Sequence, residues 1–202
     1  MTSHESIDQP GLPGFGAARP QTLHNVFFAL VPDEASRRAI AAAARQIERD
    51  LRPRGRWIKP ARFHLTLHYL GTFSQTPQGL IISAIEAAQR VRVDAFELVL
   101  DRMGSFRNRS VPLWLGASTP PHGLIELHDA LRTALFGAGA KPAAGPGFAA
   151  HVTILRDADR AIATAPIAPI RWRVDEFVLI DSVLGAQSEH IVRGRWRLGE
   201  AP

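Results

Sequence analysis

The chain has 202 residues, of which 46% are hydrophobic, and its 24 basic and 19 acidic side chains give a net charge of +5. These values are typical of a folded globular protein, and the length allows one domain or two small lobes that share one core. The absence of cysteine excludes disulfides, thiolate metal sites and a cysteine nucleophile. Because there is no run of 18 apolar residues and the N-terminus is polar, we expect a cytoplasmic protein that does not associate with membranes.

Arginine supplies nearly all of the positive charge, since Lys59 and Lys141 are the only lysines. The guanidinium group binds phosphate through two parallel hydrogen bonds, so this composition favours an anionic partner. A genome that favours arginine codons would produce the same excess. The charge alone therefore indicates an anionic partner only weakly.

The N-terminal segment differs in composition from the rest of the chain. Residues 1–22 are rich in glycine and proline and contain few apolar side chains. Such a segment buries too little apolar surface to fold, so we expect a disordered leader. The remaining residues, 23–202, are expected to form a single domain of two lobes.

Strand and helix patterns alternate in the first half of this domain. Residues 26–31 form a short apolar run typical of a strand, and a helix with one apolar face follows Asp33, its expected N-cap. A short extended piece over 56–58 precedes a strand over 64–70, in which apolar and polar residues alternate. A second amphipathic helix is predicted over 77–91.

The second half repeats this pattern, with strands predicted over 96–100 and 111–115, a helix over 120–136, a Gly/Ala/Pro-rich loop over 137–147, and strands over 151–155, 171–180 and 191–198. Several of these strands follow one another without a crossover helix, which favours antiparallel sheets and the α+β class. Because the two halves resemble each other, we predict two pseudo-symmetric lobes around a central groove, each a small, mostly antiparallel sheet backed by helices.

One four-residue pattern occurs twice, as His-Leu-Thr-Leu at 64–67 and as His-Val-Thr-Ile at 151–154. The composition predicts roughly 0.07 copies by chance, so the pair is a strong signal where one copy would be weak. In a strand, alternate side chains share a face. Each copy therefore directs its histidine and threonine to one side and its two apolar residues into a core.

Two such motifs that face each other across a groove can carry acid–base chemistry on a phosphate. His64 and His151 titrate near neutrality, so one can donate a proton while the other accepts one. The hydroxyls of Thr66 and Thr153 can donate to phosphate oxygens. A regular strand would turn Arg156 away from the groove, but the strand is predicted to end there, so the chain can bring this arginine back. The alternatives are structural imidazoles bonded to backbone, threonines favoured by β-propensity, and a solvated arginine.

Metal binding is the main chemical alternative. His64 and His68 share a face of the regular strand, and His151 could complete a three-histidine zinc site. No carboxylate lies beside either motif on that face, and Leu155 stands where the second copy would match His68. We therefore expect no metal and place His68 at the groove edge or in solvent. His190, in the turn before the last strand, could reach the groove.

The chain from about residue 25 to 198 resembles the 2H phosphoesterase superfamily, and within it the RNA 2′,3′-cyclic phosphodiesterases, also called 2′-5′ RNA ligases. The paired motifs are specific to the superfamily, and flanking residues favour this branch. The matching segments are Phe27–Leu30 with Pro32, Trp57, Phe63–Leu67 with Leu70 and Gly71, Trp114–Gly116, His151–Ile154 with Arg156, and Phe177–Ser182.

This resemblance implies a bilobal α+β fold with pseudo-twofold symmetry and metal-free hydrolysis of RNA 2′,3′-cyclic phosphate ends to 2′-phosphomonoesters. It implies that His64 protonates the departing 3′ oxygen, that His151 activates water, and that Thr66, Thr153 and Arg156 hold the phosphate. Run backwards, the same pair of histidines could join a 2′,3′-cyclic end to a 5′-hydroxyl, which gives a 2′-5′ linkage. We expect no cofactor and a monomer without an obligate protein partner, with RNA ends or a small nucleotide as its substrate.

Two other functions remain open from the sequence. The same mechanism could act on a small cyclic nucleotide, an ADP-ribose cyclic phosphate or a 2′-5′ oligoadenylate. The protein could also be a non-catalytic RNA-end-binding protein, although binding alone does not require two titrating groups.

Overall fold

The computed structural model describes residues 22–106, 110–145, 147–185 and 188–199, so the predicted leader lies, except for Thr22, outside the described residues. The elements are, in chain order, β1 (Leu23–Leu30), α1 (Glu34–Leu51), β2 (Arg56–Trp57), the 3-10 helix η1 (Pro60–Arg62), β3 (Leu65–Phe73), α2 (Gln78–Ala88), β4 (Phe96–Ser105), β5 (Leu113–Gly116), α3 (His122–Gly137), β6 (His151–Arg156), β7 (Ala165–Val174), β8 (Glu176–Leu184) and β9 (Glu189–Arg197). In this described part of the chain, no helix is long and apolar enough to cross a bilayer.

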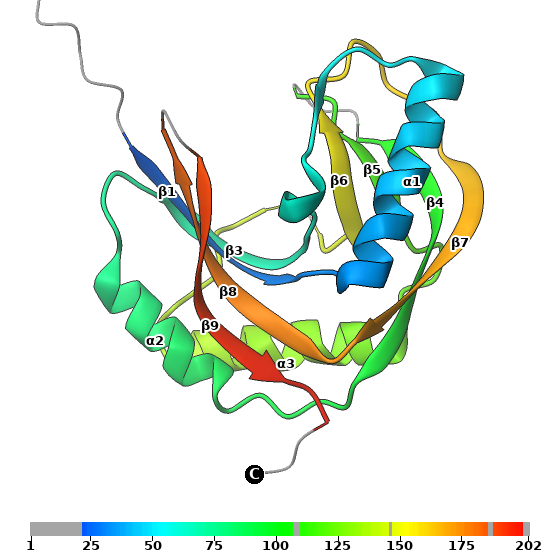
Figure 1. The fold of residues 1–202 in the computed structure, drawn as a ribbon. Helices are drawn as coiled ribbons and strands as arrows, with labels where there is room; N and C mark the ends of the chain where they lie inside the picture. Colours follow the sequence, from blue (N-terminus) through cyan, green and yellow to red (C-terminus); the bar gives the residue numbers. More distant parts are fainter. Residues whose placement is uncertain (1–21, 107–109, 146, 186–187, 200–202) are drawn as a thin grey trace, which may run out of the picture.

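The strands form one antiparallel sheet whose order is β7-β4-β5-β6-β3-β1-β8-β9, with β2 paired to β6. The predicted α+β class with antiparallel pairing is confirmed. The two lobes, visible as two arms of the ribbon in Figure 1, meet where β3 pairs with β6 through Leu65 and Val152. The two predicted small sheets are thus joined at their inner edges by this pair.

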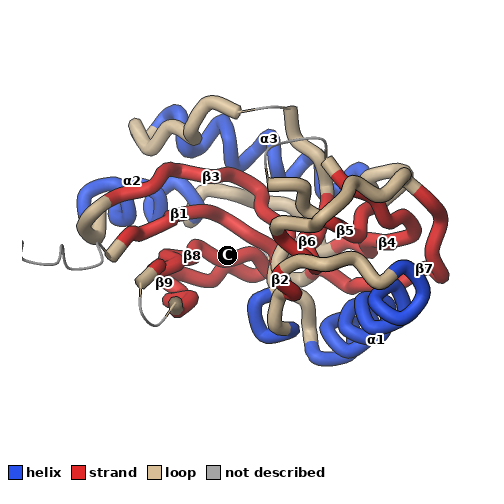
Figure 2. Tube along the Cα trace, turned by 90° about the horizontal axis from the view of Figure 1, so that it is seen from above, coloured by secondary structure: helices blue, strands red, loops and turns tan. Residues whose placement is uncertain are grey.

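The helices cover the sheet because each has one apolar face. Helix α1 begins where the side chain of Asp33 accepts a 2.7 Å hydrogen bond from the backbone of Ser36, as expected for an N-cap. Its apolar residues, including Ile40 and Ile47, lie in the main core. Figure 2 shows the strands lying between α3 on one side and α1 on the other.

One predicted element is wrong. The single strand expected over 171–180 is two strands, β7 and β8, separated at Asp175. The chain crosses here from one lobe to the other, because β7 pairs with β4 whereas β8 pairs with β1 and β9. Strand-favouring residues lie on both sides of Asp175 and hide this break, although aspartate is disfavoured in strands.

A β-bulge in β3 interrupts the alternation of its side chains. Between Thr66 and His68 the partner strand β1 advances by only one residue, which leaves Leu67 as the extra residue. Leu67 and His68 are consequently both buried, and Tyr69 returns to the groove face. The predicted position of His68 at the groove edge is therefore wrong.

Strand β6 carries the same irregularity at the equivalent place. Between Thr153 and Leu155 the partner strand β5 advances by only one residue, so Ile154 is extra. Ile154 and Leu155 are both fully buried. The bulge thereby returns Arg156 to the face occupied by His151 and Thr153, which a regular strand would not do.

The junction of the lobes depends on buried apolar side chains. Leu65 has no exposed surface, so the substitution Leu65→Ala should remove buried area and leave a cavity. We expect it to lower the free energy of unfolding by about 2–5 kcal/mol, measured by urea denaturation. Ile82→Ala is the control, because Ile82 is 57% exposed and its truncation should cost less than about 0.5 kcal/mol. Equal losses in the two variants would contradict the importance of this junction.

Candidate active site

Both motif histidines are oriented in the same way, by a hydrogen bond to a carbonyl two residues earlier. Nδ1 of His64 lies 2.8 Å from the carbonyl oxygen of Arg62, and Nδ1 of His151 lies 2.7 Å from that of Ala149. Because a carbonyl only accepts, Nδ1 carries the proton in each ring. A neutral ring therefore keeps an unprotonated Nε2, the atom that can exchange a proton with a substrate.

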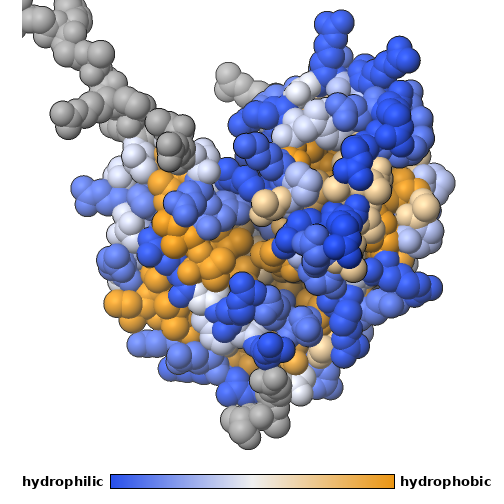
Figure 3. Space-filling model, viewed as in Figure 1, coloured by the Kyte–Doolittle hydropathy of each residue, from blue (hydrophilic) through white to orange (hydrophobic). Residues whose placement is uncertain are grey.

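The two motifs converge where β3 meets β6. Extending the antiparallel register of the junction by one residue in each direction sets His64 opposite Thr153 and Thr66 opposite His151. These four side chains are half-buried, whereas the apolar residues between them are fully buried. The structure therefore brings both predicted pairs to one face, and the outline of the molecule is hollowed between the two lobes (Figure 3).

Positive charge from two arginines acts on the first of the two imidazoles, that of His64. One charge belongs to Arg156, which its bulge returns to this face, and the other belongs to Arg62, at the end of η1. The pKa of His64 is lowered to about 4, first by burial and then by both arginines and the second imidazole, while the bond to the carbonyl raises it. Burial also lowers the pKa of His151. Both rings are therefore neutral at neutral pH.

Aromatic rings flank both imidazoles. Phe27 of β1 stacks on His64 with ring centroids 4.9 Å apart, and Phe106 meets His151 edge-on, also at 4.9 Å. Trp114 of β5 packs against Phe106 at 5.4 Å. These contacts restrict the rotation of the imidazoles. Phe27 lies in a continuously apolar run, so sequence patterning did not distinguish it from a core residue.

Two further residues join the site on the His64 side. The ring of His190 lies 5.5 Å from that of His64 and 6.0 Å from that of Phe27, so His190 does reach the groove. Nη2 of Arg62 donates to Oγ of Ser182 at 3.2 Å. Arg62 precedes the first motif in a 3-10 helix, outside any periodic pattern, which is why the sequence analysis missed it.

The histidine set considered for zinc does not assemble. His68 points into the core, is 6% exposed and donates from Nε2 to the carbonyl of His128 at 2.8 Å. Its ring lies 4.2 Å from that of His128, which in turn stacks on Phe148 at 4.2 Å. Within the described ranges, no cluster of three or more histidine or carboxylate side chains could hold a metal ion.

Comparison with known proteins identifies the family to which this chain belongs. Residues 31–186 match the model of the 2′-5′ RNA ligase superfamily, so the chain is a member of that family. The resemblance to the 2H phosphoesterases is therefore confirmed.

Individual relatives agree with this assignment. Two curated relatives are both named RNA 2′,3′-cyclic phosphodiesterase. One, from Escherichia coli strain K12, is 35% identical over 147 residues, which are 71% of this chain and 80% of the relative. The other, from Aquifex aeolicus strain VF5, is 27% identical over 111 residues, or 54% of this chain and 58% of the relative.

The fold also matches solved structures. The crystal structure of Escherichia coli LigT in apo form superposes with a TM-score of 0.69 at 30% identity, covering 91% of this chain and 100% of LigT. LigT complexed with phosphate superposes with a TM-score of 0.66, also at 30% identity, over 91% of this chain and 100% of LigT.

The charge around His64 predicts a response to anions. Inorganic phosphate bound in the groove should reverse the effect of the arginines and raise the pKa of His64 from about 4 toward neutrality. NMR titration of the imidazole ring protons, with and without phosphate, measures this shift. The ring protons of His122, which is 93% exposed at the start of α3, are the control and should not move when phosphate is added at constant pH. A titration of His64 that phosphate leaves unchanged would show that the anion does not bind beside it.

Proposed function

We propose that this protein hydrolyses a 2′,3′-cyclic phosphate at an RNA end to a 2′-phosphomonoester. The observation that supports this most directly is the matched pair of imidazoles, each with Nδ1 bonded to a carbonyl and Nε2 available, on motifs joined by one strand pairing. The names of the curated relatives support the cyclic phosphodiester as the substrate class.

The remaining motif residues suit a phosphate. The hydroxyls of Thr66 and Thr153 lie on the same face as the imidazoles and donate to its non-bridging oxygens. Arg156 lies near enough to lower the pKa of His64, so it also lies near enough to offset negative charge that builds on the phosphate. These groups stabilise the transition state without requiring a metal ion.

The reaction proceeds by in-line displacement. Nε2 of His151 accepts a proton from water as the water oxygen bonds to phosphorus, and the bond between phosphorus and the 3′ oxygen breaks. Nε2 of His64, protonated when the substrate anion offsets the arginines, gives its proton to the departing 3′ oxygen. The product carries a 2′-phosphate and a free 3′-hydroxyl. When a 5′-hydroxyl replaces water as the nucleophile, the same displacement forms a 2′-5′ linkage and again releases the 3′-hydroxyl.

Removal of either imidazole should stop this chemistry. His64→Gln and His151→Gln should each lower kcat by about 10²–10⁴-fold on a short RNA ending in a 2′,3′-cyclic phosphate, because acid–base catalysis typically contributes that much. Phosphorus NMR should place the wild-type monoester on the 2′ oxygen, and activity should persist in excess chelator. His122→Gln, which removes an exposed imidazole from α3, is the matched control and should retain full activity.

A motif variant with wild-type turnover would contradict the two-histidine mechanism. Loss of wild-type activity in chelator would contradict the metal-independent reaction.

The pH dependence should differ between the free enzyme and its complex. His64 acts as the acid, so activity falls as pH rises through its pKa. In the free enzyme the pKa of His64 is low, so kcat/KM should begin to decline at low pH. In the complex the bound anion raises the pKa of His64, so the alkaline limb of kcat should lie at higher pH. Arg156→Gln removes a charge that lowers this pKa and should move the limb of kcat/KM to higher pH. Identical limbs for kcat and kcat/KM would contradict this coupling.

A further inference from the structure

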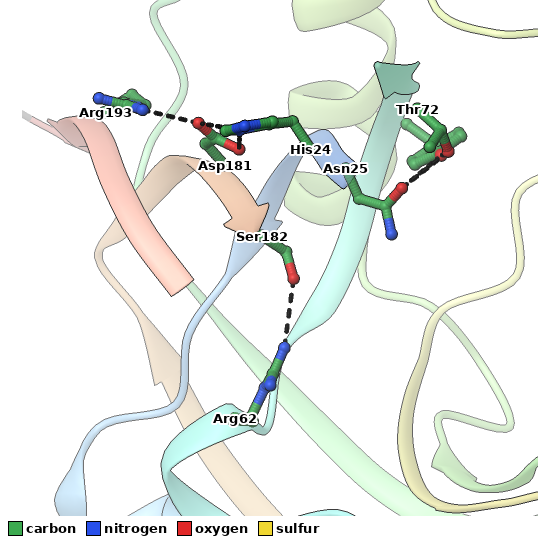
Figure 4. A network of polar contacts seen from close by, with 8 residues as sticks. His24, Asn25, Arg62, Thr72, Asp181, Ser182 and Arg193 are labelled. Atoms are coloured by element: carbon green, nitrogen blue, oxygen red, sulfur yellow. Dashed lines mark hydrogen bonds and ion pairs between the residues drawn. The ribbon is translucent and has the colours of Figure 1, made fainter. Parts of the chain in front are cut away.

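Three side chains lie beside the catalytic pair, and the mechanism above assigns none of them a contact with the substrate. Arg62, Ser182 and His190, here called the Arg62 shelf, lie on the flank of His64 that faces away from β6. Ser182 of β8 and His190 of β9 are direct partners in the strand register, and Ser182 binds the guanidinium of Arg62. Figure 4 shows Arg62 reaching from the segment before β3 to Ser182.

The charge of Arg62 is not neutralised by the protein. Its guanidinium donates to neutral oxygens, Oγ of Ser182 at 3.2 Å and the carbonyl of Ser188 at 3.5 Å, and among the described residues no carboxylate pairs with it. Burial lowers its pKa, and Arg156 and Arg56 lower it further, so Arg62 lies in a positive field. A half-buried cation in such a field is stabilised by an anionic ligand.

The nearest buried carboxylate faces the other way. Asp181 has no exposed surface, and it is already bound by His24 at 2.9 Å and by Arg193 at 2.7 Å. Adjacent residues of a strand point to opposite faces, so Asp181 and Ser182 lie on different sides of β8. Figure 4 shows the two contacts as separate groups.

The direction of the reaction determines which anion lies near the shelf. If His151 activates water and His64 protonates the 3′ oxygen, the attacking and leaving groups lie on opposite sides of phosphorus. The ribose, which carries the 3′ oxygen, therefore lies on the His64 side, together with the 5′ phosphodiester of the same nucleoside. The ring of His190 is 5.5 Å from that of His64, so the shelf begins directly beside this leaving group.

We propose that the Arg62 shelf binds the phosphodiester on the 5′ side of the terminal nucleotide, and that the enzyme therefore prefers RNA ends to mononucleoside cyclic phosphates. This inference rests on the proposed function. The guanidinium of Arg62, already oriented by Ser182, donates to the non-bridging oxygens of that phosphodiester, and His190 forms the adjacent wall. Arg156 remains beside the cyclic phosphate, so the two arginines bind successive phosphates of one strand.

The test compares three substrates that differ in the internal linkage. They are adenosine 2′,3′-cyclic phosphate, the dinucleotide ApA with a 2′,3′-cyclic end, and the same dinucleotide with an uncharged methylphosphonate in place of the internal phosphodiester. Wild-type enzyme should show a kcat/KM for the charged dinucleotide at least about tenfold above the other two, the usual effect of one charge-assisted contact. Arg62→Gln should abolish this preference, so that kcat/KM becomes equal for the charged dinucleotide and its methylphosphonate analogue, and Arg62→Lys should restore part of it. Because Arg62 also lowers the pKa of His64, any change through that acid should affect all three substrates alike, and the ratios between substrates are the readout.

Arg56→Gln is the matched control. It removes one charge from the same arginine cluster, but its guanidinium already pairs with Asp157 at 2.9 Å, so the preference should persist. Equal losses on all three substrates in Arg62→Gln, or wild-type indifference to the methylphosphonate, would overturn the assignment of the shelf while leaving the proposed function intact. Failure of the wild-type enzyme to hydrolyse any of the three would instead overturn the proposed function, and the shelf with it.

Discussion

The pairing of β3 with β6 is the constraint on which the site depends. It joins the inner edges of the two lobes through Leu65 and Val152, and both residues lie inside the motifs. The apolar half of each motif therefore fixes the lobe junction while the polar half forms the site. Because stability and chemistry use alternate residues of the same strands, the distance between the imidazoles is set by core packing rather than by a mobile loop.

The second governing feature is positive charge beside His64. Arg62 and Arg156 both act on His64, and in the described ranges of the chain no carboxylate forms an ion pair with Arg62. Such an arrangement costs free energy without a ligand and is relieved by a phosphate. In the proposed mechanism, the anion that is bound is therefore also the one that would allow His64 to hold a proton, which would make substrate binding and preparation of the acid one event.

Periodic features of the fold could be predicted from the sequence, and irregular ones could not. The strands, the helices and both motifs follow alternation or helical spacing, which depends only on which residues face the core. The bulge at Leu67 leaves no mark in the pattern of apolar and polar residues. Regular alternation therefore predicted His68 in the groove, whereas the bulge places it in the core. Arg62 lies in a single 3-10 turn, and Phe27 in a run that is apolar on both faces, so neither has a periodic signal.

The two bulges also show how a symmetric fold obtains an asymmetric site. Each bulge buries two consecutive residues and returns the next residue to the groove face. That next residue is Arg156 in β6 but Tyr69 in β3. Tyr69 lies opposite Phe27, the ring that stacks on His64, and its hydroxyl donates to Asn25. The His64 side thus lacks the cation that its symmetry-related strand carries. Arg62 supplies a positive charge on this side from η1, outside the strand, so the two lobes provide their arginines from different kinds of element.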